Sequence, residues 1–206
     1  MRLASATLVA VLLLTDAVAS QVSPAPRRPE LPLGLDLYMH VPDDNPLTPA
    51  KVALGRILFF DSLLSEDRSL ACASCHNPGR AFTDGQPVSV GVFGRKGTRN
   101  VPTLVNRTYG ETFFWDGRIT TLEEQVLQPI QNRKELDMTV EQVVVRLKHE
   151  EDYRELFQTA FGSVEGRVNA EDLAKALASY VRSIMSGNAP VDRYVNGERD
   201  ALSKRA

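Results

Sequence analysis

The only two cysteines of the chain lie beside a histidine within five consecutive residues, Cys72-Ala73-Ser74-Cys75-His76. The spacing C-x-x-C-H is typical of sites where a haem is attached covalently. In such a site each thiol bonds one vinyl group of the porphyrin, and the adjacent imidazole becomes an axial ligand of the iron. The motif therefore predicts one covalent haem c, held by Cys72 and Cys75, with His76 as the iron ligand.

Three other interpretations fit the same residues. A redox C-x-x-C site usually accompanies a βαβ unit, and the sequence has no such alternation. A structural zinc site needs four ligands, and only His40 and His149 remain to complete one, neither at ligand spacing. The third interpretation is a chance match in an exported, disulfide-bonded protein. The export signal and the helical context favour the haem.

The first 19 residues have the pattern of a secretory signal peptide. Arg2 supplies a positive start, an apolar run follows from Ala6 to Leu14, and Ala17-Val18-Ala19 offers a small-x-small cleavage site. The run is too short to span a bilayer, although an N-terminal membrane anchor is the alternative. We therefore expect export to a bacterial-type periplasm, with residues 20–41 as a Pro-rich linker or extension.

Helix signals dominate residues 42–197, which we expect to form one domain. Thr48-Pro49 pairs an N-cap residue with a proline at the first helical position. Val52, Leu54, Ile57 and Leu58 follow at the spacing of one helical face. A helix beginning at Pro49 is therefore expected to bury these four side chains.

The longest helix is expected near the C-terminal end of this domain. Asn169 is a good N-cap residue, and Leu173 and Leu177 follow on one face, while Gly187 and Pro190 would end the helix. Further helices are expected after the capping-box residues Thr121 and Thr139 and over residues 153–161.

Residues 77–118 differ from the rest, because they are rich in glycine and lack a helical period. A loop of this length inside a compact domain is usually functional or wraps another group. A buried porphyrin would give the segment something to pack against. The expected fold class is all-α, a c-type cytochrome-like haem domain with a long irregular central loop.

The size and charge of the chain narrow the classes of function. Its 206 residues suit one domain, or at most two small ones. It has 24 Lys and Arg against 26 Asp and Glu, a formal net charge of −2. This balance provides no positive field for a polyanion, so we expect no nucleic-acid partner.

Four further segments occur in a fixed order around the haem motif. They are VALGRILFFD at 52–61, AFTDG at 81–85, RNVPTLVN at 99–106 and FWDGR at 114–118. Together with the haem motif they resemble the N-terminal, peroxidatic-haem domain of the bacterial di-haem cytochrome c peroxidases and their methylamine-utilisation relatives. The resemblance runs from about Pro42 to the C-terminus.

This resemblance implies a role for each matching side chain. Glu135 matches the distal general acid–base, which takes a proton from peroxide and returns it to the departing oxygen. Gln125 matches a glutamine of the same pocket, and Trp115 matches the tryptophan on the electron path between the two haems. Asn100 falls where the family has a calcium ligand.

The same resemblance implies the partners. The substrate is hydrogen peroxide, which is reduced to water, and a small cytochrome c or cupredoxin supplies the electrons. Calcium is an expected additional ion. The sequence does not settle the oligomeric state, and a homodimer is compatible with it.

Two features depart from the family pattern. Many members place a histidine that ligates the iron in the Gly-x-Gly loop after the haem motif, where this chain has Val92. Valine cannot ligate iron, so we expect the haem to be open without reductive activation. No cysteine follows Cys75, and residues 198–206 resemble the start of the linker to the family's second haem domain. We therefore expect a truncated or split form of a di-haem enzyme, or an incomplete sequence of one.

Two other functions are compatible with a single haem. A mono-haem electron carrier usually has a methionine as its sixth ligand, and the candidates are Met39, Met138 and Met185. An inactive remnant would bind haem without being re-reduced. A peroxidase reacts rapidly with peroxide, which distinguishes it from both.

Overall fold

The computed structural model describes residues 30–162, 166–203 and 205, and the predicted signal peptide lies outside them. The described residues form helices, short 3-10 turns and loops, and their β pairing is limited to three isolated bridges. The all-α prediction is confirmed. None of the described helices has the length and apolar character needed to cross a membrane.

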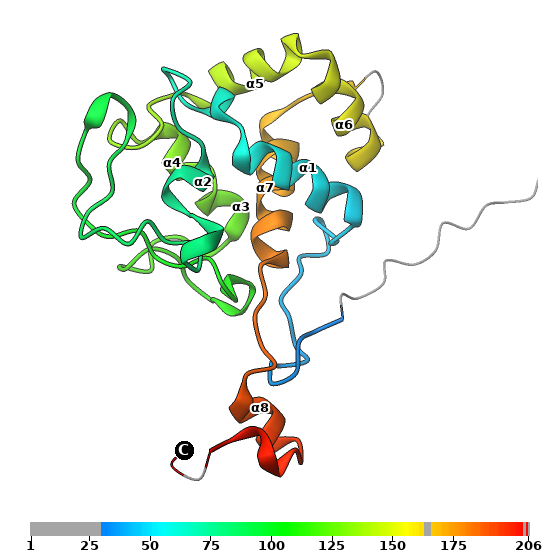
Figure 1. Ribbon diagram of the computed structural model, residues 1–206. Helices are drawn as coiled ribbons and strands as arrows, with labels where there is room; N and C mark the ends of the chain where they lie inside the picture. Colours follow the sequence, from blue (N-terminus) through cyan, green and yellow to red (C-terminus); the bar gives the residue numbers. More distant parts are fainter. Residues whose placement is uncertain (1–29, 163–165, 204, 206) are drawn as a thin grey trace, which may run out of the picture.

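Two long helices form the centre of the molecule. Helix α1 spans Pro49–Phe60 and packs mainly against α7, which spans Ala170–Ser183. Figure 1 shows this pair in the middle, with α5 (Val140–His149) and α6 (Glu151–Phe161) over one end. The short helix α3 (Leu122–Gln125) packs against α7, while α2 (Cys72–Cys75) contacts α1 and α4 (Gln128–Gln131) contacts α3. Helix α8 (Pro190–Val195) lies below the body in Figure 1.

The predicted start of α1 is confirmed, but the helix buries a face partly different from the predicted one. The Thr48 side chain accepts a hydrogen bond from the Lys51 amide, and Pro49 opens the helix. The backbones of α1 and α7 meet at Gly55, where an added Cβ would lie 2.0 Å from the carbonyl oxygen of Ala176. Ile57, two residues further on, points to nearly the opposite side and is 42% exposed, so its predicted burial was wrong.

The predicted start of α7 is confirmed at Asn169, whose side chain accepts from the Asp172 amide. Its predicted end at Gly187 and Pro190 was wrong, because α7 ends at Ser183 and Pro190 instead opens α8. The cause is a contact distant in sequence. The amide of Asn106 donates to Ile184 O at 2.9 Å, and its side chain bonds both backbone groups of Ser186 at 2.9 Å.

The irregular segment predicted at 77–118 is present and contains only single 3-10 turns, at Pro78–Arg80, Val92–Gly94 and Arg107–Tyr109. Its residue Phe82 packs at the edge of the main hydrophobic cluster, as does Cys72. Phe59 of α1 joins that cluster to the haem motif, since its ring centroid lies 6.4 Å from that of His76 and 5.0 Å from that of Tyr180.

A buried polar network fixes α3 against α7. Arg182, 2% exposed, donates to both carboxylate oxygens of Glu123, at 2.6 and 2.8 Å. The fully buried Asn45 also donates to Glu123, at 2.6 Å, and accepts from Lys51 Nζ at 3.1 Å. Burial alone would raise the pKa of Glu123, but the bonds from Arg182 and Asn45 hold that pKa below its ordinary value.

Substitution Glu123→Gln is expected to lower the free energy of unfolding by about 3 kcal/mol, because it leaves the Arg182 charge buried without its counter-ion. Urea denaturation measures the loss.

The contribution of the wild-type pair is present at neutral pH and is lost as acid protonates Glu123, because its pKa is lowered on folding. Glu171→Gln is the matched control, since Glu171 pairs with Lys175 of the same helix but is 73% exposed. Equal losses of stability in both variants would contradict a stabilising role for the buried Glu123–Arg182 pair.

Candidate haem and peroxide site

Helix α2 is one turn long and carries both thiols. Cys72 is its first residue and Cys75 its last, and side chains three apart share one helical face. The turn is held at its start by the Ser74 hydroxyl, which accepts from the Ala71 amide at 3.0 Å. At its end the His76 amide donates to Cys72 O at 2.9 Å. The backbone therefore presents both thiols and the imidazole together.

The two thiols are free and partly buried. Burial raises the pKa of Cys72 to about 12, with a further contribution from the neighbouring Cys75. Burial raises the pKa of Cys75 to about 11, and the charge of Glu135 raises it further. The raised pKa values favour the thiol form of both groups at neutral pH.

The ring of His76 is oriented by a backbone carbonyl. Its Nδ1 lies 2.9 Å from the oxygen of Phe82, and because a carbonyl can only accept, Nδ1 carries the proton. Burial lowers the pKa of His76, while the bond to Phe82 opposes the shift. The Pro102 carbonyl opposes the shift as well. The imidazole is thus neutral, with its lone pair on Nε2, which is the form that a metal ligand needs.

The Phe82 carbonyl that contacts His76 belongs to an unusual turn. Ala81 and Phe82 both have left-handed backbone conformations, with φ of 52° and 58°, although neither is glycine. The Phe82 amide donates to Asn77 O at 2.8 Å, and Thr103 Oγ1 donates to Ala81 O at 2.6 Å. Consecutive strained residues of this kind persist only where the surroundings fix them, and they cluster at functional sites.

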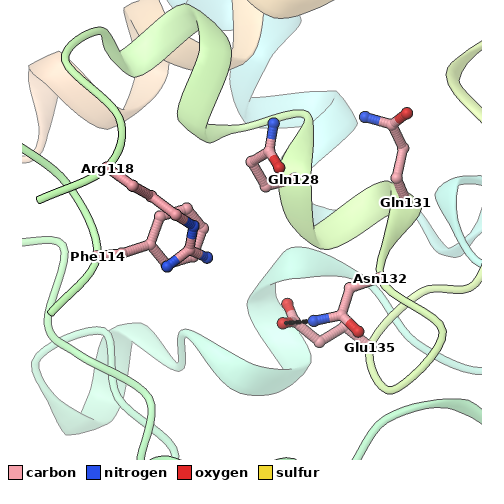
Figure 2. A pocket seen from close by; sticks show the side chains of 6 residues that line it. All are labelled: Phe114, Arg118, Gln128, Gln131, Asn132 and Glu135. Atoms are coloured by element: carbon pink, nitrogen blue, oxygen red, sulfur yellow. Dashed lines mark hydrogen bonds between the residues drawn. The ribbon is translucent and has the colours of Figure 1, made fainter. Parts of the chain in front are cut away.

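A cavity of about 190 Å³ lies between Glu135 and Arg118. Figure 2 shows Glu135 and Asn132 on one side of it, with Arg118 and Phe114 on another. The Arg118 guanidinium lies 3.6 Å from the Phe114 ring centroid and pairs with Asp116 at 2.7 Å. The lining residues are Phe114, Arg118, Gln128, Gln131, Asn132 and Glu135.

Glu135 has the environment of an acid–base group. Burial raises its pKa above the ordinary value, against a 2.6 Å hydrogen bond from Asn132 Nδ2 and the charge of Arg118, which both lower it. The charge of Glu135 contributes to the raised pKa of both thiols. The next residue, Leu136, belongs to the main hydrophobic cluster, against which Cys72 also packs.

The other predicted side chains lie outside this cavity. Trp115 is 71% exposed and follows Phe114, which lines the cavity. Gln125 does not line it, and its Oε1 is buried without a hydrogen-bond partner. Asn100 is exposed, and no group of three or more His, Cys, Asp or Glu side chains in residues 30–162 and 166–203 is arranged for a metal ion.

Sequence reasoning missed several cavity residues. Gln128, Gln131, Asn132 and Glu135 are polar at positions i, i+3, i+4 and i+7, and this spacing could have indicated a shared face. Arg118, which also lines the cavity, was not predicted as a site residue. The fully buried Val92 has its amide bonded to the Glu135 carbonyl at 2.9 Å.

The donor set of this site fits a c-type haem. The two free thiols share one helical turn, and the neutral imidazole beside them keeps Nε2 available. Cys72 and Cys75 would hold the porphyrin through thioethers, and His76 would bind the iron from one side. The partnerless Oε1 of Gln125 is an unsatisfied buried acceptor at the end of α3.

Solved structures that share this fold include a MauG-like protein and a diheme peroxidase. A MauG-like protein associated with microbial copper homeostasis superposes with a TM-score of 0.78 at 33% identity, covering 86% of this chain and 52% of that one. The diheme peroxidase BthA from Burkholderia thailandensis has a TM-score of 0.66 at 28% identity, covering 77% of this chain and 44% of that one. The domain therefore has the fold of one part of a diheme peroxidase.

The sequence profile of the di-haem cytochrome c peroxidases matches residues 49–200, and the chain belongs to this family. Methylamine utilization protein MauG of Methylorubrum extorquens is 43% identical over 165 residues, 80% of this chain and 46% of that protein. Cytochrome c551 peroxidase of Pseudomonas aeruginosa is 36% identical over 158 residues, 77% of this chain and 46% of that protein. The chain spans about half the length of the curated relatives it matches.

Proposed function

We propose that residues 42–197 are a periplasmic c-type haem peroxidase domain that reduces hydrogen peroxide to water. The observation that carries the proposal is the cavity lined by Glu135, whose neighbour Leu136 belongs to the hydrophobic cluster against which Cys72 of the haem motif packs. Family membership supports both the haem and the reaction. Residues 1–19 are proposed as the export signal and residues 198–206 as the start of the linker to a second haem domain.

A bound haem would supply the iron centre that accepts peroxide and carries the oxidising chemistry. Glu135 would take a proton at its carboxylate from the incoming peroxide and return it to the departing oxygen. Its raised pKa suits both roles, because a group that titrates nearer neutrality can accept and donate. Asn132 would hold the carboxylate through its 2.6 Å bond.

The electrons would come from a small cytochrome c or cupredoxin through a second haem. The exposed indole of Trp115, next to the cavity residue Phe114, supports a place on that path. Gln125 as a pocket residue and Asn100 as a calcium ligand rest on the family resemblance alone. Val92, buried and bonded through its amide, supports an iron position left open on the cavity side.

The test uses the haem-loaded chain without a donor, because the proposed electron path needs a second haem. We expect a rapid reaction with peroxide, followed through the haem absorption, and an oxidised spectrum with a high-spin contribution. A spectrum showing methionine–iron ligation, without peroxide consumption, would instead identify an electron carrier. A purely low-spin, bis-histidine spectrum would contradict the open position.

A further inference from the structure

Glu135 lies in a short turn, residues 132–137, which we call the acid turn. The amides of Glu135 and Asp137 both donate to Asn132 O, at 2.9 and 3.1 Å. Asp137 has a left-handed backbone, with φ of 53°. The Asn132 side chain then closes the turn by its bond to the Glu135 carboxylate. The direction of that carboxylate therefore depends on the path of this turn.

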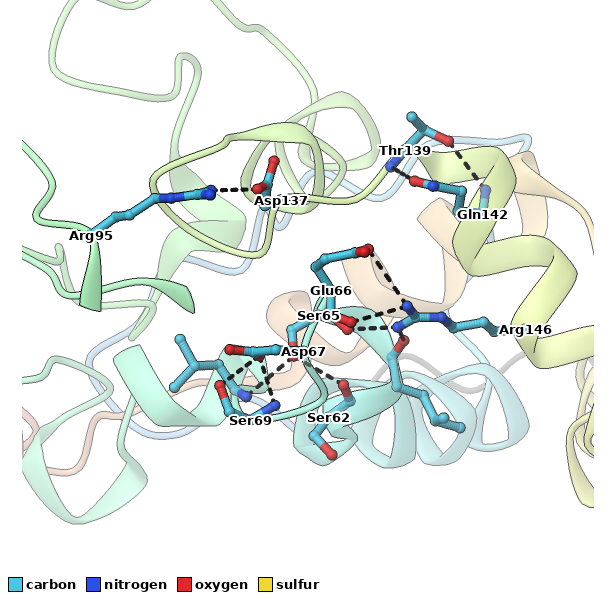
Figure 3. Close-up of polar contacts among 12 residues, drawn as sticks. Ser62, Ser65, Glu66, Asp67, Ser69, Arg95, Asp137, Thr139, Gln142 and Arg146 are labelled. Carbon is cyan, nitrogen blue, oxygen red and sulfur yellow. Dashed lines mark hydrogen bonds and ion pairs between the residues drawn. The ribbon is translucent and has the colours of Figure 1, made fainter. Parts of the chain in front are cut away.

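The loop at residues 91–95 holds the acid turn from one side. The amide of Val92 donates to Glu135 O at 2.9 Å. Gly91 permits this approach, because an added Cβ there would lie 2.1 Å from Lys134 O. The Arg95 guanidinium donates to Arg133 O at 2.7 Å and forms an ion pair with Asp137. Arg95 thus contacts the turn on both sides of Glu135, and Figure 3 shows its pair with Asp137.

A second segment holds the acid turn from another direction. The Glu66 amide donates to Leu136 O at 2.9 Å. Arg146 of α5 fixes this segment, since its guanidinium donates to Ser65 O at 2.6 Å and to Glu66 O at 3.1 Å (Figure 3). Arg146 also forms an ion pair with the Glu66 carboxylate at 3.5 Å. The acid turn is therefore held from two directions, and Arg95 is the side chain that contacts it directly.

We infer that Arg95 is a positioning residue, which holds the carboxylate of Glu135 at the cavity through Arg133 O and Asp137. The inference rests on the proposed function of Glu135. The Arg95 and Asp137 side chains are 37% and 22% exposed, so their pair adds little to the stability of the whole domain. Its effect is local, on the path of the acid turn.

The experiment compares variants of the haem-loaded protein. Arg95→Gln removes the charge, and Asp137→Asn removes the partner while keeping a residue that tolerates a left-handed backbone. Each is expected to lower the rate constant for reaction with peroxide about tenfold, since small displacements of a catalytic group are costly. Arg193→Gln is the matched control, because Arg193 pairs with Glu198 at similar exposure and lies on α8.

Two readouts separate positioning from general damage. Hydrogen exchange at the Val92 amide should quicken about tenfold in Arg95→Gln, while the amide of Leu177 in α7 should keep its protection. In the Glu135→Gln background, Arg95→Gln should have no further effect on the peroxide rate, because the group it positions is gone.

The outcomes are distinct. Loss of rate only where Glu135 is present, with faster exchange at Val92, supports the inference. An equal loss in the Glu135→Gln background, or unchanged exchange at Val92, overturns it while leaving the proposed function intact. If Glu135→Gln itself keeps the full rate, the proposed role of Glu135 fails and the positioning role of Arg95 fails with it.

Discussion

Glu135→Gln is expected to lower the rate constant for the reaction of the haem-loaded protein with peroxide by about 10²–10⁴-fold, the usual contribution of a general acid–base group. The amide keeps the size of the side chain but cannot take a proton from peroxide. Stopped-flow mixing, followed through the haem absorption, measures the change. Haem content and the oxidised spectrum should stay as in the wild type.

The control for this substitution is Glu124→Gln, the same chemical change at an exposed residue of α3. It should leave the rate unaltered. A comparable loss of rate in both variants, or no loss in Glu135→Gln, would show that Glu135 is not the acid–base group.

The pH dependence of the peroxide rate tests the role of Glu135 independently. Burial raises the pKa of Glu135, with Asn132 and Arg118 acting in the opposite direction. Because the base form is the ionised one, the wild-type rate should rise with pH through a pKa above the ordinary glutamate value. That rise should be absent from Glu135→Gln. A wild-type rate that is flat through this range would contradict the assignment.

Replacing both Cys72 and Cys75 by alanine is expected to abolish covalent haem attachment, because no other thiol exists in the chain. Denaturing electrophoresis with haem staining should show the wild-type band and no band for the double variant. Mass spectrometry should find the haem on the tryptic peptide 69–80, which contains both cysteines.

The control is Ala73→Ser, which changes the residue between the thiols without altering their spacing. It should keep the haem. Haem that remains bound to the double variant after denaturation would exclude thioether attachment at α2.

The sequence predicted those parts of the fold that local chemistry determines. Thr48 with Pro49, the capping box at Thr139 and the cap at Asn169 are local signals, and each begins a helix in the structure. The burial of Ile57 and the end of α7 were predicted wrongly, because they depend on close approach at Gly55 and on Asn106, which is distant in sequence.

The sequence likewise predicted one part of the candidate site and missed another. Cys72, Cys75 and His76 are adjacent in sequence, so their grouping needed no fold. The family resemblance supplied Glu135. The contacts of Arg95 and Val92 with the turn around Glu135 join residues about 40 positions apart, and the place of Arg118 at the cavity depends on the path of the loop that carries it. Such contacts depend on how the irregular segment folds, and its glycine-rich sequence carries no periodic signal.

The central claim is that this fold places an acid–base group against a covalent haem and so makes it reactive towards peroxide. The most direct test compares the intact haem-loaded protein with its own tryptic haem peptide, residues 69–80, which keeps Cys72, Cys75 and His76 but lacks the Glu135 cavity. On rapid mixing with peroxide, the intact protein should react at least about 10²-fold faster. Equal rate constants for the protein and the peptide would contradict the claim.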